Sequence, residues 1–340
     1  MVDAWGRVEI TGRRRWSRLH KKTEINMAEC PACLIVSANA EELAAEVARV
    51  ADVPIVIRAC TSVEQALGEY VDELVVFGNP GMIAEILPQL PLVEWVQSSW
   101  AGVTPLLELD RRDYVLTGIK GAFGPQISEY VFAYLLAHEL KVLRRMNEQR
   151  EHHWFSVSSG TLHGKRFGIM GTGTIGRHIA KTAQYFGATV SGLSRSGAPV
   201  DGFEKVMQTD RLHEFLEDID YLVAALPQTV ATDRLLDAAA LAQLPAHAYF
   251  VNIGRSNVVD DDALIKALQN DRLAGAALDV FDEEPIAQDS PLWDAPNLSI
   301  TAHVAAVSHP SIIVPIFLHN YRCFTNKQAL KYVVDFAAGY

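Results

Sequence analysis

The stretch "GIMGTGTIGRHIA", residues 168–180, decides the fold of the second half of the chain. Its glycines have the G-x-G-x-x-G spacing, follow a short apolar run and precede a helical pattern, which is the context that a dinucleotide-binding loop requires. Gly171 allows the tight turn, Gly173 lets the backbone approach a pyrophosphate, and Gly176 lets helix and strand pack closely. The amide groups at the helix N-terminus favour an anion. The stretch predicts a Rossmann unit whose phosphate loop consists of Gly171, Thr172, Gly173, Thr174, Ile175 and Gly176.

The next strand ends in "GLSRSG", residues 192–197, where such proteins usually place an acid that holds the adenosine ribose. This chain has Ser194, Arg195 and Ser196 there instead. A guanidinium pairs with a phosphate in bidentate fashion, and hydroxyl groups can donate to it. We therefore expect NADPH to be preferred, with NADH as the alternative cofactor. The competing interpretation of Arg195 is a solvent-facing residue in a turn.

Short apolar runs alternate with helical patterns along most of the chain, which is typical of βαβ units and parallel sheets. The predicted strands are residues 33–38, 55–59, 74–78, 94–99, 114–118, 166–171, 188–194, 219–226, 248–253, 275–280 and 298–302. The predicted fold class is α/β, with two Rossmann/flavodoxin-like domains that have parallel sheets, and with an active-site cleft between the two domains.

Charge and pattern also indicate domain boundaries. Residues 1–26 are rich in Arg and Lys and are predicted to form a disordered basic leader. Residues 27–124 together with 308–340 are predicted to form the substrate (catalytic) domain, because the final helix is expected to return to it. Residues 125–307 form the predicted dinucleotide-binding Rossmann domain, which begins with one long helix over 126–147.

Composition excludes several classes of partner. The 340 residues are 49% hydrophobic and 21% charged, with a net charge of −11 that argues against nucleic acid. No apolar run is long enough to predict a transmembrane helix. Cys30 and Cys33 form a C-x-x-C, but it precedes an apolar run and has no second pair, so neither a redox nor a metal site is predicted. The low cysteine count favours a reducing, cytoplasmic location.

Three polar residues follow predicted strands of the second half at the edge where ligands bind in open α/β sheets. Arg255, Glu284 and His303 come after the strands over 248–253, 275–280 and 298–302 respectively. Each alone is more often a surface cation, a solvated loop carboxylate or a structural imidazole. Together they suit reduction of a 2-oxo acid, in which Arg255 clamps the carboxylate, His303 donates the proton and Glu284 orients the imidazole.

Five segments in order resemble the D-isomer-specific 2-hydroxyacid dehydrogenase family: "GIMGTGTIGRHIA", "ALPQTVATD", "VNIGRSNVVDDDALIKAL", "GAALDVFDEEP" and "SPLWDAPNLSITAHVAA". Within that family, "SPLW", "LSRS" and "VDFAAGY" are most similar to the glyoxylate/hydroxypyruvate reductase A type. "VQSSWAGVTPL", residues 97–106, extends the resemblance into the first domain.

The resemblance implies roles for individual residues. It makes Arg255, Glu284 and His303 the catalytic residues. The substrate-binding residues that it implies are Trp100, Ala101, Gly102, Arg255 and His303. Beyond the phosphate loop and the residues at 194–196, the cofactor-binding residues that it implies are Leu226, Pro227, Thr232, Ile253, Gly254 and Asp279. It implies no metal.

The family is usually dimeric, so a homodimer is expected, with Trp154 reaching toward the neighbouring subunit. Two residues depart from the family pattern: Ser256 replaces a Gly, where a Cβ would restrict the turn if a positive φ were needed, and Ala302 replaces a Pro. Trp100 and Trp293 are expected to narrow the pocket and thereby favour small substrates.

The sequence thus predicts an oxidoreductase that uses NADPH to reduce small 2-oxo acids, glyoxylate or hydroxypyruvate, to D-2-hydroxy acids. One alternative is a dehydrogenase for a bulkier 2-oxo acid. The other is a non-catalytic, nucleotide-sensing scaffold of the same fold.

Overall fold

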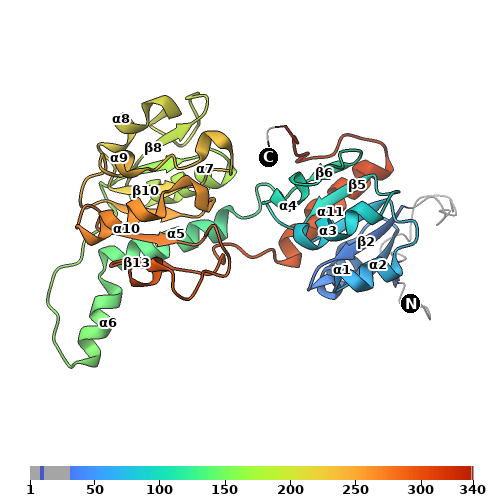
Figure 1. Cartoon of the computed structure of the whole chain (residues 1–340), viewed down its shortest axis with the longest axis horizontal. Helices are drawn as coiled ribbons and strands as arrows, with labels where there is room; N and C mark the ends of the chain where they lie inside the picture. The colour runs from blue at the N-terminus through green and yellow to red at the C-terminus, as the bar shows by residue number, and fades with distance from the viewer. Residues whose placement is uncertain (1–7, 11–30, 338, 340) are drawn as a thin grey trace, which may run out of the picture. The chain divides into compact units, whose positions relative to one another are not determined.

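The computed structural model describes residues 8–10, 31–337 and 339. The chain forms two compact units (Figure 1), of which the first comprises Met1–Ala122 with Ser308–Tyr340 and the second Phe123–Val307. The leader predicted over residues 1–26 lies outside the described residues, apart from a short strand at Val8–Ile10 that the sequence does not predict.

The first unit is built on a six-stranded sheet. Its strands are β1 (Val8–Ile10), β2 (Ala32–Val36), β3 (Ile55–Cys60), β4 (Val75–Gly78), β5 (Trp95–Ser98) and β6 (Val115–Thr117). The order is β1-β3-β2-β4-β5-β6, in which β2 to β6 pair in parallel and β1 adds an antiparallel edge. Residues 33–36 are fully buried, as expected for a parallel strand that is covered on both faces.

The last long helix of the chain packs on this first sheet. The helical segments of the unit are α1 (Ala40–Val50), α2 (Val63–Glu69), α3 (Pro80–Ile86), η2 (Leu87–Gln89), α4 (Thr104–Leu107) and α11 (Pro310–Thr325). Phe317 of α11 stacks on Phe77 of β4 and on Trp95 of β5, with ring centroids 4.5 and 5.6 Å apart. Such aromatic stacking fixes α11 to the sheet although it is remote in sequence.

The second unit has a seven-stranded, all-parallel sheet. Its strands are β7 (Arg166–Met170), β8 (Thr189–Ser194), β9 (Lys205–Gln208), β10 (Tyr221–Ala224), β11 (Tyr249–Asn252), β12 (Gly275–Leu278) and β13 (Leu298–Ile300). The order β13-β12-β11-β10-β7-β8-β9 reverses between β7 and β10, as in dinucleotide-binding folds. The predicted α/β class with parallel sheets is confirmed.

The prediction of one helix over residues 126–147 is wrong, because the chain forms two helices there. The helical segments of this unit are α5 (Gly124–Glu139), α6 (Val142–Arg150), α7 (Thr174–Tyr185), η3 (Thr209–Arg211), α8 (Leu212–Leu216), η4 (Val230–Thr232), α9 (Ala238–Leu241), η5 (Ser256–Val258), α10 (Asp261–Gln269) and η6 (Pro291–Asp294). Lys141 adopts a left-handed φ of 53° between α5 and α6. Helix α5 buries Ile127, Val131 and Leu135, whereas every residue of α6 stays at least partly exposed. The apolar face that holds α5 ends where the break occurs.

The C-x-x-C lies only partly within the described residues. Cys33 is a free, buried thiol in β2, and its C-x-x-C partner Cys30 lies outside the described residues. Across the described parts of the chain, none of the helices has both the length and the apolar character needed to cross a bilayer.

Candidate active site

The phosphate loop joins β7 to α7, and two of its glycines are required by the chain itself. Gly171 has a φ of 103°, and a Cβ there would lie 2.5 Å from the carbonyl oxygen of Ala225. A Cβ on Gly176 would lie 2.0 Å from the carbonyl oxygen of Gly171. Both distances are far below van der Waals contact, so only glycine fits the turn and the close approach of α7.

Gly173 differs because nothing in the chain lies within 4 Å of the position of its Cβ. It is the N-cap of α7, a helix of twelve residues. The space in front of its backbone is therefore free for a ligand, and the helix N-terminus favours an anion there. Thr172 and Ile175 are half-buried and Thr174 is exposed. This arrangement fits the pyrophosphate of a dinucleotide.

The end of β8 carries the residues predicted to hold a 2′-phosphate. Ser194 is half-buried, and its Oγ accepts a hydrogen bond of 3.1 Å from the amide of Gly197. Arg195 and Ser196 are exposed. Among the described residues, the Arg195 guanidinium has no hydrogen bond and no ion pair, so it is available to a ligand.

The loops after β10 and β11 lie against each other. A Cβ on Gly254 would lie 2.8 Å from the backbone of Leu226, so these loops touch through their main chains. Leu226 and Ile253 are buried and Pro227 is exposed. Thr232 is buried and its hydroxyl donates to the carbonyl oxygen of Pro227 at 2.8 Å. Thr232 therefore shapes the loop that presents Pro227.

Arg255 follows β11 and is held by a residue to which the sequence analysis gives no role. Asn252 is fully buried, accepts from the amide of Gly254 at 3.1 Å and donates to the carbonyl oxygen of Arg255 at 3.0 Å. Burial lowers the pKa of Arg255, and the nearby Glu284 carboxylate opposes this shift. A partly buried guanidinium beside a carboxylate is suited to bind an anionic ligand.

The Gly-to-Ser departure does not strain this turn. Ser256 opens the 3-10 helix η5, and its φ is not positive. The Cβ of Ser256 therefore meets no backbone restriction here.

His303 and Glu284 form a hydrogen-bonded pair. The His303 Nδ1 lies 2.9 Å from Glu284 Oε2, and the other Glu284 oxygen accepts from the amide of Phe281 at 3.0 Å. Both side chains are partly exposed. Since Nδ1 faces the carboxylate, Nε2 is the nitrogen left to exchange a proton with a substrate.

Asp279 holds the loop that carries His303. It is nearly fully buried, and its oxygens accept from the amides of Val304 and Ala305, both at 2.8 Å, and from the Thr301 hydroxyl at 2.6 Å. The backbone amide of His303 also donates to the carbonyl oxygen of Asp279 at 2.9 Å. Asp279 therefore positions His303, a role that no sequence motif indicates.

Ala302 stands where the family usually has Pro, and hydrogen bonds to Asp279 fix the conformation of this loop instead. His303 has a left-handed φ of 53°, which is uncommon for a residue with a side chain. The hydrogen bonds to Asp279 compensate for that backbone cost.

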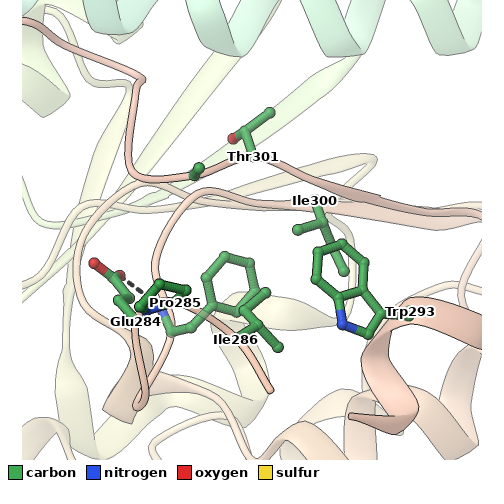
Figure 2. A pocket seen from close by; sticks show the side chains of 8 residues that line it. Glu284, Pro285, Ile286, Trp293, Ile300 and Thr301 are labelled. Carbon is green, nitrogen blue, oxygen red and sulfur yellow. Dashed lines mark hydrogen bonds between the residues drawn. The ribbon is translucent and has the colours of Figure 1, made fainter. Parts of the chain in front are cut away.

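A pocket of about 390 Å³ adjoins Glu284. Its lining residues are Phe281, Glu284, Pro285, Ile286, Trp293, Ile300, Thr301 and Ala302. In Figure 2, Glu284 lies at one end and Trp293 at the other, with Ile286 between them. The hollow is mainly apolar and would accept an apolar group next to the His303–Glu284 pair.

The predicted carboxylate-binding loop follows β5 in the first unit. Trp100 and Ala101 are exposed and Gly102 is half-buried. The amide of Trp100 already donates to Ser98 Oγ at 3.0 Å. In the described part of the chain, the amides of Ala101 and Gly102 have no acceptor. Of the three predicted amide donors in this loop, those of Ala101 and Gly102 are thus free for a ligand, and that of Trp100 is not.

In the second unit, Glu284 therefore bonds to His303 and lies near enough to Arg255 to influence its guanidinium. The loop of Trp100, Ala101 and Gly102 belongs to the first unit. No group of three His, Cys, Asp or Glu side chains in the described ranges could hold a metal ion.

Comparison with known proteins agrees with this chemistry. The family model for the D-isomer specific 2-hydroxyacid dehydrogenase NAD binding domain matches residues 132–305, slightly more than half of the chain. Glyoxylate/hydroxypyruvate reductase A of Serratia proteamaculans is 32% identical over 244 residues, which cover 71% of this chain and 74% of that protein.

Solved structures extend the likeness to both units. A D-isomer specific 2-hydroxyacid dehydrogenase family protein from Aeromonas salmonicida has a TM-score of 0.85 and 35% identity, covering 90% of this chain and 99% of that one. The NADPH-dependent glyoxylate/hydroxypyruvate reductase of Sinorhizobium meliloti, solved with NADP and sulfate, has a TM-score of 0.79 and 27% identity, covering 92% and 100%. The chain belongs to the D-isomer specific 2-hydroxyacid dehydrogenase family and is an NAD(P)-dependent 2-hydroxyacid dehydrogenase or reductase.

Proposed function

We propose that the protein reduces small 2-oxo acids, glyoxylate or hydroxypyruvate, to D-2-hydroxy acids with NADPH. The observation that carries the proposal is the hydrogen-bonded His303–Glu284 pair at the sheet edge that also presents Arg255. In this assignment the second unit holds the dinucleotide, and the loop of Trp100, Ala101 and Gly102 in the first unit binds substrate.

The preference for NADPH rests on the end of β8. Arg195 is exposed and unpaired among the described residues, and Ser194 and Ser196 flank it. An acid that would repel a 2′-phosphate is missing from these positions. The S. meliloti relative, described as NADPH-dependent, was solved with NADP, which supports the same choice.

The residues divide the chemistry among them. Bound NADPH would supply the hydride. Arg255 binds the substrate carboxylate and polarises the neighbouring carbonyl, and the free amides of Ala101 and Gly102 bind carboxylate oxygens. His303 Nε2 donates a proton to the carbonyl oxygen, while Glu284 accepts from Nδ1 and keeps the ring oriented.

The test is a panel of 2-oxo acids assayed by the loss of NADPH absorbance. We expect turnover with glyoxylate and hydroxypyruvate, and chiral analysis of the glycerate formed from hydroxypyruvate should give the D isomer. NADPH binding without turnover of any 2-oxo acid would contradict the proposal and favour a nucleotide-sensing scaffold.

A second candidate substrate class is favoured by one observation. The apolar pocket beside Glu284 would hold the side chain of a bulkier 2-oxo acid. Phenylpyruvate in the same panel decides between them: a kcat/KM above that of glyoxylate would assign the protein to the bulkier class.

We further propose that the protein is a homodimer that assembles through α6 and the segment after it. Leu143 is 65% exposed and Trp154 is 95% exposed, and Met146 is exposed on the same helix as Leu143. Leu143 and Met146 lie on α6 and Trp154 lies in the segment that follows it, and exposed apolar side chains that gather in this way are typical of a protein interface. The free thiols Cys33, Cys60 and Cys323 fit a reducing compartment, so we place the reaction in the cytoplasm.

A further inference from the structure

The segment that ends β5 ties its own backbone into a fixed shape. Ser98 Oγ donates to the carbonyl oxygen of Trp100 at 3.0 Å and accepts from its amide at 3.0 Å. These bonds leave the amides of Ala101 and Gly102 as adjacent donors without an acceptor in the described part of the chain. Their direction is what determines how well the loop binds a carboxylate.

The side-chain amide of Gln97, in β5, bonds to two segments of the chain, one of which leads into this loop. Gln97 Nε2 donates to the carbonyl oxygen of Ser98 at 3.0 Å and to that of Gly118 at 3.1 Å. The segment after β6 in turn meets the loop, because the Ile119 amide donates to the carbonyl oxygen of Trp100 at 3.4 Å. Gln97 is fully buried, so water cannot replace these bonds.

The orientation of the Gln97 amide is fixed by the groups that it contacts. Trp95 Nε1 is only a donor, and it donates to Thr117 Oγ1 at 2.8 Å. The Thr117 hydroxyl donates to Gln97 Oε1, also at 2.8 Å. The Thr117 hydroxyl also lies 3.3 Å from the carbonyl oxygen of Val96, so this chain of donors does not fix the amide alone. The carbonyl oxygens of Ser98 and Gly118 can only accept, so the NH2 group of Gln97 must face the loop and its oxygen must face Thr117.

Asn320 of α11 is the second residue that bonds to the Gln97 oxygen. Its Nδ2 donates to Gln97 Oε1 and to the carbonyl oxygen of Lys331, both at 3.0 Å, and its Oδ1 accepts from the Lys331 amide at 2.8 Å. The next carbonyl oxygen, that of Tyr332, accepts from the Gly118 amide at 3.1 Å. Asn320 is fully buried as well.

We propose that Gln97 and Asn320, oriented through Thr117, are positioning residues for the substrate-binding loop: they hold the Ala101 and Gly102 amides toward the carboxylate of the 2-oxo acid. This inference rests on the proposed function of that loop. A fully satisfied buried network rigidifies what it supports, and loss of one member leaves the others unpaired and frees the loop.

The test compares variants by steady-state kinetics with glyoxylate and by NADPH binding. Gln97→Met keeps the volume but removes every hydrogen bond of the side chain, and Thr117→Val removes the hydroxyl that donates to Gln97 and accepts from Trp95 Nε1. We expect both to raise KM for glyoxylate about tenfold, the equivalent of weakening one hydrogen bond to a charged group. The change in kcat should be smaller, and the Kd of NADPH should stay unchanged.

Two controls separate positioning from stability. Thr117→Ser keeps the hydroxyl and should stay within about twofold of the wild-type KM. Leu34→Ala in the core of β2 lowers the melting temperature without touching the loop and should leave KM unchanged. Unchanged KM in Gln97→Met, or an equal rise in Leu34→Ala, would overturn the proposal.

A second readout does not depend on turnover. Titration with oxamate, a carboxylate that resembles a 2-oxo acid, is followed through the backbone amide NMR signals of Ala101 and Gly102. We expect both signals to shift in the wild type, and oxamate to bind about tenfold more weakly to Thr117→Val than to the wild type and Thr117→Ser. If the panel shows no turnover but these signals respond in this way, the proposed function fails and the positioning role stands. Signals that do not respond in the wild type would overturn the inference.

Discussion

At the scale of single residues, the site depends as much on side chains that hold loops as on those that face a substrate. Asn252 fixes the turn of Arg255, and Asp279 fixes the loop of His303. Neither role can be predicted from the sequence, because the acceptors and donors involved become neighbours only when separate loops fold together. The strand ends do predict Arg255, Glu284 and His303, since parallel strands bring their carboxyl ends to one edge.

Glu284→Gln tests the charge of the His303 partner. The amide oxygen can still accept from Nδ1, but the negative charge beside the imidazole and the bond from the Phe281 amide are lost. We therefore expect kcat for glyoxylate to fall about 10- to 100-fold. Fluorescence titration should show the same Kd for NADPH as in the wild type. A variant that retains most of its kcat would show that the carboxylate only supports the fold.

Arg195→Gln tests the cofactor assignment. Loss of a charged contact to the 2′-phosphate should lower kcat/KM for NADPH about 10- to 100-fold, while that for NADH stays within about threefold. The comparison is made with both cofactors at saturating glyoxylate. Arg177→Gln is the control, because Arg177 is also exposed but donates to the carbonyl oxygen of Thr172 in the phosphate loop at 3.3 Å. Any effect of its loss should therefore be the same with NADPH and with NADH. Parallel losses with NADPH and NADH in Arg195→Gln would contradict the assignment.

At the scale of elements, burial decides what the sequence can predict. Strands β2 and β11 consist mainly of buried residues, and the predicted bounds of both lie within two residues of the observed ones. Strand β9 is missed because only Met207 of its four residues is buried, so it carries no strand pattern. The prediction of one helix over residues 126–147 is wrong for a different reason. Residues with high helix propensity continue beyond α5, although the buried face of that helix has ended.

The first turn of α10 offers a pH-dependent test of the fold. Burial raises the pKa of Asp261 to about 6, with further increases from Asp282, Asp260 and Asp262. Because this value lies above that of the unfolded chain, the folded state loses stability as pH rises from about 4 to about 6. Asp261→Asn should therefore raise the free energy of unfolding by about 1 kcal/mol at pH 8 and change it little at pH 4. Urea denaturation at both pH values checks this, and a gain that is equal at both would contradict it.

At the scale of the whole molecule, the first unit consists of two separate stretches of the chain. Helix α11 lies at the end of the sequence but packs on the first sheet through Phe317. The pattern of apolar runs predicts both sheets. It does not predict the course of the segment after α6, where Arg145 donates to the carbonyl oxygens of Phe155 and Val157. Those bonds join an arginine to main-chain groups, which no sequence pattern marks.

The exposed face of α6 predicts the oligomeric state. Light scattering after size exclusion should give twice the mass of the chain for the wild type. Leu143→Glu places a charge in the proposed interface and should shift the protein toward monomer at micromolar concentration. Tyr185→Glu, at the end of α7, should remain dimeric although Tyr185 is more exposed (87%) than Leu143 (65%). A monomeric wild type would contradict the homodimer.

In the proposed NADPH-dependent reduction, His303 is the proton donor. The most direct measurement is the rate of NADPH oxidation with saturating glyoxylate in the wild type and in His303→Asn, together with the Kd of NADPH for both. We predict a loss of at least about 100-fold in kcat with an unchanged Kd for NADPH. A His303→Asn variant that keeps most of the wild-type kcat would contradict the account.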